Sequence, residues 1–189
     1  MGIKNKIICV EHVLCEGNFG SGKYYGYNSK KIISLVKIST EKKIYGIGES
    51  LVGIYSPELF EINIKYLSRV FLGKDARESL SEIENLQRNK FFINSGLIKS
   101  IISAIEISLI DIISKEENLS ISKTIKNIYN IRSVYRDVNV YASAGSINSN
   151  LSDLKKDIKR SKELDIDKIK MRSNISKNSL QRHLWFSIR

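Results

Sequence analysis

The segment 138–172 constrains the fold more than any other part of the sequence. Its pattern predicts a strand at 138–142, a helix over 151–164 and a second strand at 166–172, joined by short loops. This order is typical of a right-handed parallel βαβ unit, with functional groups where the strands end on their C-terminal side. A parallel sheet needs further strands at its edges and helices on both faces, yet only residues 173–189 follow. We therefore expect the front part of a larger α/β protein.

Composition argues against several classes of protein. The 189 residues are 42% apolar and 27% charged, as in ordinary globular domains. The only cysteines, Cys9 and Cys15, have no cluster of Cys and His around them and no secretory leader before them, so we read them as reduced thiols of a cytoplasmic protein. The longest apolar run, within 97–113, is interrupted by charged residues and falls short of a membrane span.

The formal net charge of +11 raises nucleic-acid binding as a function, because Lys and Arg contacts to phosphates supply most non-specific affinity. The basic residues, however, are spread through every segment, and no recognition motif with interleaved aromatics accompanies them. Abundant Ile, Lys and Asn indicate coding from AT-rich DNA, in which Lys fills solvated surfaces. We expect no nucleic-acid partner and keep a basic nucleic-acid-binding module as an alternative.

The N-terminal part of the chain predicts a small sheet. Loose alternation of polar and apolar residues predicts a strand at 3–14, and two further runs at 32–39 and 43–49 predict a hairpin. Between them, the stretch 16–28 is rich in Gly and Tyr and is expected to form a surface loop.

Helices are expected after the only proline, Pro57, which fits the first turn of a helix with Ser56 as its N-cap. From there the apolar period changes to 3.6 residues. The expected helices cover 57–71, 76–90 and 95–115.

The third of these helices has the most continuous apolar stripe and should organise the first domain. Beside the stripe, Asp111 and Lys115 make an i, i+4 ion pair in the favourable order. We interpret Glu106 and Asp111 as structural carboxylates rather than catalytic ones.

The segment Gly17–Tyr24 nearly matches the phosphate-binding pattern G-x-x-x-x-G-K-[ST]. The match fails at Tyr24, where a short hydroxyl should hold Mg²⁺, and the Gly and Tyr residues that follow oppose the required helix. A small nucleotide-binding protein that uses Gly17–Lys23 remains an alternative, beside a substrate lid or a plain loop.

A row of cations follows from strand geometry, which places Lys168, Lys170 and Arg172 on one face and Ile169 and Met171 on the other. Inside a barrel such a row needs carboxylates or an anionic substrate, and a desolvated Lys there is a plausible base. The alternative is an edge strand with a solvated basic face.

The order of these features resembles the N-terminal part of the mandelate racemase/muconate lactonizing enzyme group of the enolase superfamily. The resemblance covers about residues 5–172 and rests on the order and spacing of several segments. They are the hairpin end Tyr45-Gly46-Ile47-Gly48-Glu49-Ser50, the segment Leu72-Gly73-Lys74-Asp75, the helix segment 103–112, and the two strand segments 138–145 and 168–172.

The resemblance implies an α+β capping domain over 1–132, with a three-stranded meander and a helical bundle. It implies that 133–172 is the first βαβ unit of an incomplete α/β barrel of the TIM type, and we expect an aberrant or disordered tail at 173–189.

The function implied by the resemblance is metal-assisted abstraction of the proton α to a carboxylate, as in an acid-sugar dehydratase or a racemase. The complete family uses Mg²⁺, whose acidic ligands come from later barrel strands, so we expect no metal or other cofactor in this chain and no activity of the chain alone. A second chain that completes the barrel, or a homo-oligomer, is the expected partner, and an acid-sugar-like carboxylate is the expected ligand.

The resemblance also assigns site residues. The family's K-x-K pair falls on Lys170 and Arg172, with Arg172 at the position usually filled by the catalytic Lys; arginine is a poor base and would instead stabilise a carboxylate or enolate. Tyr24, Tyr25 and Tyr55 fall in loops that match the substrate-closing loops of the capping domain, one of them spanning 51–56.

Overall fold

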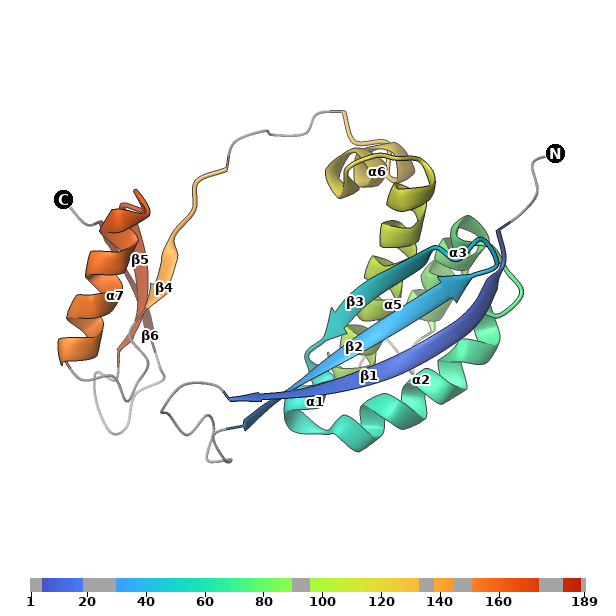
Figure 1. The fold of residues 1–189 in the computed structure, drawn as a ribbon, viewed down its shortest axis with the longest axis horizontal. Coiled ribbons are helices and arrows are strands. Elements are labelled where there is room, and N and C mark those ends of the chain that lie inside the picture. Colours follow the sequence, from blue (N-terminus) through green and yellow to red (C-terminus); the bar gives the residue numbers. More distant parts are fainter. Residues whose placement is uncertain are drawn as a thin grey trace. The chain divides into compact units, whose positions relative to one another are not determined.

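The structure is a computed structural model that describes residues 5–18, 30–89, 96–132, 138–144, 151–173 and 182–187. It divides into two compact units, Met1–Val134 and Tyr135–Arg189 (Figure 1).

The first unit contains a three-stranded antiparallel sheet of β1 (Ile7–Asn18), β2 (Lys30–Thr40) and β3 (Tyr45–Ser50), in the order β1-β2-β3. The three predicted strands are therefore present. The first one is displaced toward the C-terminus from the expected 3–14, because its pairing with β2 continues until Asn18 lies opposite Lys30.

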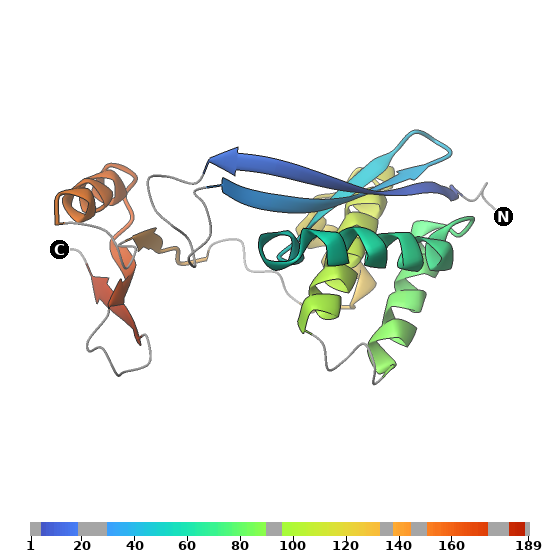
Figure 2. The same cartoon turned by 90° about the horizontal axis from the view of Figure 1, so that it is seen from below.

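The helices of this unit lie on one face of the sheet (Figure 2). They are α1 (Val52–Tyr55), α2 (Pro57–Phe71), α3 (Ala76–Arg88), α5 (Gly96–Glu116) and α6 (Ile121–Ile128). Helices α2, α3 and α5 agree with the three predicted helices to within two residues at each end. The prediction of a loop over 51–56 is wrong for Val52–Tyr55, which form a single helical turn.

Local chemistry explains where two helices begin. Pro57 occupies the first turn of α2, where its missing N–H costs nothing, and Ser56 is the N-cap residue, although its side chain makes no capping bond. Helix α3 begins with a capping box: the Asp75 carboxylate accepts from the N–H groups of Arg77 and Glu78, and the Glu78 carboxylate accepts from the Asp75 N–H.

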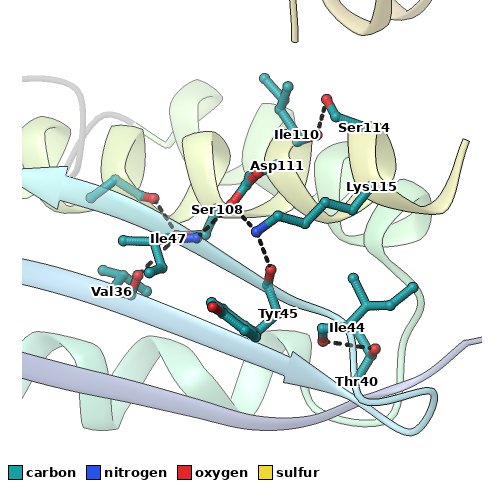
Figure 3. Close-up of polar contacts among 11 residues, drawn as sticks. Val36, Thr40, Ile44, Tyr45, Ile47, Ser108, Ile110, Asp111, Ser114 and Lys115 are labelled. Carbon is teal, nitrogen blue, oxygen red and sulfur yellow. Dashed lines mark hydrogen bonds and ion pairs between the residues drawn. The ribbon is translucent and has the colours of Figure 1, made fainter. Parts of the chain in front are cut away.

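Helix α5 packs closely on β3 because two of the three inward positions of that strand are glycines. Gly46 and Gly48 are buried, and a Cβ on either would overlap a backbone carbonyl of α5, at Ser108 and Ala104 respectively. The Ser108 hydroxyl donates to the Ala104 oxygen (2.9 Å) and lies 3.2 Å from the Val36 oxygen of β2 (Figure 3). The helix backbone therefore rests directly on the sheet.

Apolar side chains from the sheet, α2, α3 and α5 form one core around this contact. Its largest fully buried members include Phe60, Phe71, Ile38, Ile105 and Leu109. Removal of that much apolar surface from water is the main source of stability for the first unit.

The second unit has the predicted strand–helix–strand order. Strand β4 (Ala142–Ala144) pairs in parallel with β5 (Lys168–Ser173), and α7 (Leu151–Glu163) lies between them in the sequence. The strand expected at 138–142 instead begins at Ala142, because the ladder pairs Ala142–Ala144 with Ile169–Met171.

The range 173–189, expected to be an aberrant or disordered tail, contains a strand. Strand β6 (Arg182–Ser187) pairs antiparallel with β5, which gives the sheet order β4-β5-β6.

In the second unit, the large apolar side chain of Ile169 in β5 is fully buried. Other apolar side chains are exposed to solvent, with 73% of Val138, 68% of Leu151 and 62% of Leu164 exposed.

Within the described part of the chain, no helix has the length and apolar character needed to cross a membrane.

The contact between α5 and β3 predicts the effect of a single methyl group. We expect Gly48→Ala to lower the free energy of unfolding by about 1–3 kcal/mol, because the new Cβ collides with the Ala104 carbonyl and the helix must move. Urea denaturation followed by circular dichroism measures the change. Gly17→Ala is the matched control, since a Cβ at Gly17 meets nothing within 4 Å; equal stability of the two variants would contradict the close packing of α5 on β3.

Candidate functional site

Two parts of the chain carry the predicted site residues: the α1 turn of the first unit, with Tyr55, and strand β5 of the second unit, with Lys170 and Arg172.

The α1 turn is held by a buried serine. The Ser34 hydroxyl of β2 donates to the Ser50 carbonyl oxygen (2.6 Å) and accepts from the Gly53 N–H (2.9 Å). Gly53 is required at this position because a Cβ would lie 2.7 Å from the Ser34 side chain. One hydroxyl therefore ties the end of β3 to the first turn after it.

A second serine, from α5, fixes the same turn from the other side. The Ser100 hydroxyl accepts from the Leu51 N–H (2.9 Å) and lies 3.1 Å from the Ser50 hydroxyl. The result is a short rigid turn that presents Tyr55 at the surface, with 55% of the residue exposed. An exposed aromatic ring on a fixed turn is suited to contact a ligand or another part of a site.

The other two tyrosine candidates, Tyr24 and Tyr25, lie outside the described residues. Of the near match to a phosphate-binding loop, only Gly17 and Asn18 are described, and they end β1. Nucleotide binding by this segment stays a prediction.

Lys170 lies in the middle of β5, opposite Ser143 of the parallel strand β4. Its side chain is half-buried, and its Nζ lies 5.6 Å from the centre of the Tyr141 ring, within range of a cation–π contact. Its neighbour Ile169 is buried and Lys168 is exposed, which fits the predicted alternation along the strand. The ring therefore restrains a cation near the C-terminal end of a parallel strand pair.

In β5, Arg172 lies opposite His183 of β6, and Lys170 lies opposite Trp185. In an all-parallel barrel, the edge of β5 away from β4 would pair with another parallel strand. Here β6 pairs with that edge in the antiparallel sense. The chain thus provides its own neighbour for the strand that carries both cations.

The carboxylates of α5 have structural partners, as expected from their positions beside the apolar stripe (Figure 3). Asp111 accepts from the Ile47 N–H (3.1 Å) and from Lys115 Nζ (2.8 Å), and Lys115 also donates to the Tyr45 oxygen (2.6 Å). These bonds fasten the exposed edge of β3 to α5. Asp111 is therefore engaged in holding the fold.

Glu106, the other carboxylate, accepts a hydrogen bond from the Tyr129 hydroxyl, with 2.5 Å between the two oxygens. Tyr129 directly follows the last residue of α6. Partial burial of the phenol, its hydrogen bond to Glu106, and the negative charges of Glu106 and Glu84 together raise the pKa of Tyr129 to about 12. The pair joins the segment after α6 to α5.

The described residues do not fit a Mg²⁺ ion. No group of three or more His, Cys, Asp or Glu side chains among them is placed to hold a metal. The candidate strand β5 offers Lys and Arg, which repel a divalent cation, rather than the oxygen ligands that Mg²⁺ requires.

Three contributors to these sites were missed from the sequence: Ser34, Ser100 and Tyr141. For Ser34 a signal exists, because it occupies an inward position of β2 in line with Val36 and Ile38, and a polar residue at a buried position needs a partner. Ser100 and Tyr141 carry no comparable signal in the pattern.

The family model described as the mandelate racemase/muconate lactonizing enzyme N-terminal domain matches residues 25–125. Comparison with curated proteins gives no match.

Solved structures share the fold at low sequence identity. The L-talarate/galactarate dehydratase of Salmonella typhimurium LT2, liganded with Mg and L-lyxarohydroxamate, superposes with a TM-score of 0.74 at 19% identity, over 93% of this chain and 46% of its own. The 3,6-anhydro-D-galactonate cycloisomerase of Zobellia galactanivorans gives 0.65 at 23% identity, over 88% and 42%. A muconate cycloisomerase of Azorhizobium caulinodans gives 0.65 at 17% identity, over 93% and 43%. This chain spans less than half the length of these three proteins.

The Tyr129–Glu106 pair predicts a pH dependence of stability. In the unfolded chain a tyrosine loses its proton near pH 10, whereas Tyr129 in the fold keeps it until about 12. Between these values the unfolded state binds fewer protons, so stability falls as pH rises. We expect the free energy of unfolding of Tyr129→Phe to decrease less than that of the wild type as the pH rises above 10.

Urea denaturation of the wild type and Tyr129→Phe from pH 8 to 11.5 measures the difference, and Tyr66→Phe on the exposed surface of α2 is the control. Parallel pH profiles of the wild type and Tyr129→Phe would contradict the assigned role of Glu106 as the structural acceptor for Tyr129.

Proposed function

Because the chain belongs to the mandelate racemase/muconate lactonizing enzyme family, we propose that it supplies the capping domain and the first barrel strands of a site that removes the proton α to a carboxylate. The substrate class we propose is an acid sugar. Support comes from two structural relatives, one named a dehydratase of L-talarate and galactarate and one a cycloisomerase of 3,6-anhydro-D-galactonate.

The observation that carries the proposal is the position of Lys170 and Arg172 near the C-terminal end of a strand that is parallel to β4. In (β/α)₈ barrels the reacting groups come from this end of the strands. Two cations there complement a carboxylate and the negative charge that develops when its α proton leaves.

The two cations take different roles in the proposal. Arg172 remains protonated at any pH the protein survives, so it binds the substrate carboxylate and stabilises the enolate. Lys170, restrained by Tyr141, is the side chain of the pair that can exchange a proton when a substrate and a closed site exclude water. No step is assigned to a metal, since the described residues do not fit one.

We further propose that these 189 residues are inactive by themselves and act with the strands that follow them in the related chains, the first of which would take the place of β6 beside β5. The share of the related chains that this chain spans, 42–46% for the three relatives named above, supports this. The exposed apolar side chains of the second unit, such as Val138 and Leu151, are surfaces that further βα units would cover.

The test measures α-proton exchange of galactarate in D₂O by NMR in the presence of Mg²⁺. We expect no exchange with the chain alone. We expect exchange when it is mixed with a fragment of the Salmonella typhimurium dehydratase that begins where the similarity ends. Lys170→Met should lower that rate by about 100-fold or more, the range of general acid–base catalysis, and Arg172→Lys should raise it by adding a group that can be deprotonated.

Lys168→Met is the matched control, because Lys168 lies on the same face of β5 but is exposed and two residues closer to the start of the strand. Exchange by the chain alone, absence of exchange in the mixture, or equal rates for Lys170→Met and Lys168→Met would contradict the proposal.

A further inference from the structure

Strand β5 is the central strand of the sheet in the second unit, and β6 forms the longer of its two ladders (Figure 1). The pairing with β6 covers the whole of β5, from Lys168 opposite Ser187 to Ser173 opposite Arg182. The pairing with β4 covers only Ala142–Ala144. Strand β6 therefore supplies the larger part of the backbone pairing that orders β5.

The two ladders of β5 have opposite senses, since β4 is parallel to it and β6 is antiparallel. In a (β/α)₈ barrel every strand is parallel to both of its neighbours. The N–H and C=O groups along one edge of a strand can form a ladder with only one other strand. At this edge of β5, β6 and a further parallel strand therefore exclude each other.

The antiparallel strand has the advantage of a local connection. Only residues 174–181 separate β5 from β6, and closing a short loop costs little conformational entropy. A parallel neighbour needs a crossover connection of a dozen or more residues, and its ladder is slightly less stable per residue. We therefore expect β6 to keep this edge unless the parallel strand brings additional burial of apolar surface.

The apolar side chains of α7 can supply that burial. Leu151 begins the helix and Leu164 directly follows it, and 68% and 62% of these residues are exposed while β6 is in place. In a (β/α)₈ barrel each strand is followed by a helix of the outer ring, so a further βα unit would set its helix beside α7. Strand β6 leaves these side chains in solvent, whereas a further unit would cover them.

We propose that β6 is an autoinhibitory strand, which occupies the edge of β5 that the next barrel strand needs and must leave before the site around Lys170 can form. This rests on the proposed function, which places another strand at that edge. The exchange leaves the other ladder of β5 intact, with Lys170 opposite Ser143 of β4. The strand with both cations thus changes one neighbour and keeps the other.

A probe for β6 exists in the sequence. Trp185 is the only tryptophan of the chain and belongs to β6, so a chain labelled with fluorotryptophan gives a fluorine NMR signal from this strand alone. A labelled peptide of residues 174–189 gives the signal of the strand without β5. We expect the unlabelled fragment of the Salmonella typhimurium dehydratase described above to shift the signal of the full chain to that of the peptide.

Two adjacent prolines test whether the ladder with β5 is what competes with the fragment. Successive residues of an edge strand direct their N–H alternately toward the neighbouring strand and away from it, and proline is tolerated where the N–H points away. Of His183→Pro and Leu184→Pro, exactly one therefore removes a ladder hydrogen bond. Isothermal titration calorimetry should show this variant binding the fragment about fivefold more tightly than the wild type, and the other binding like the wild type.

A chain that ends at Ser173 has no β6 and should bind the fragment at least as tightly as the tighter proline variant, so the test holds even if the prolines disturb the second unit. Equal affinity of the wild type and this shortened chain, or binding that leaves the fluorine signal unchanged, would overturn the proposal and leave the proposed function standing. Failure of every version to bind the fragment would overturn the proposed assembly and this proposal with it.

Discussion

The first unit depends on the absence of two side chains. Gly46 and Gly48 let the backbone of α5 rest on β3 at Ala104 and Ser108, and this contact sets how deep the helix lies against the sheet. The apolar stripe of α5 then reaches Val36 and Ile38 of β2, so the core forms around a contact made by backbone atoms. A larger residue at either glycine would lift the helix and open the core that the stripe fills.

The same contact fixes the candidate site of the first unit. With α5 held on β3, Ser100 reaches the end of the strand and, together with Ser34, orders the α1 turn that carries Tyr55. Asp111 and Lys115 fasten the other end of β3. The serines around one end of β3 therefore position the surface turn, and Asp111 and Lys115 hold the strand at its other end.

Much of the fold could be predicted from the sequence, and the exceptions have physical reasons. The long helices were found because their apolar period is regular, as in α5, whose stripe of Ile101, Ile105, Leu109 and Ile112 is buried. The α1 turn was not predicted, because four residues are too few to show a helical period of apolar residues. Its stability also comes from serines that are distant in the sequence. Strand β6 was missed because only its pairing with β5 makes it a strand. In the candidate site, the alternation of Lys168, Ile169 and Lys170 could be deduced from the period of two, whereas the contact of Lys170 with Tyr141 depends on the register between β4 and β5.

The first unit has a large apolar core, whereas β4 and α7 of the second unit bury few apolar side chains. Hydrogen exchange followed by mass spectrometry on the full chain distinguishes the two units. We expect α5 and β2 to exchange slowest, through global unfolding, and β4 and α7 to exchange much faster, because few apolar side chains are buried there. Equal protection of both units would contradict this division of the chain.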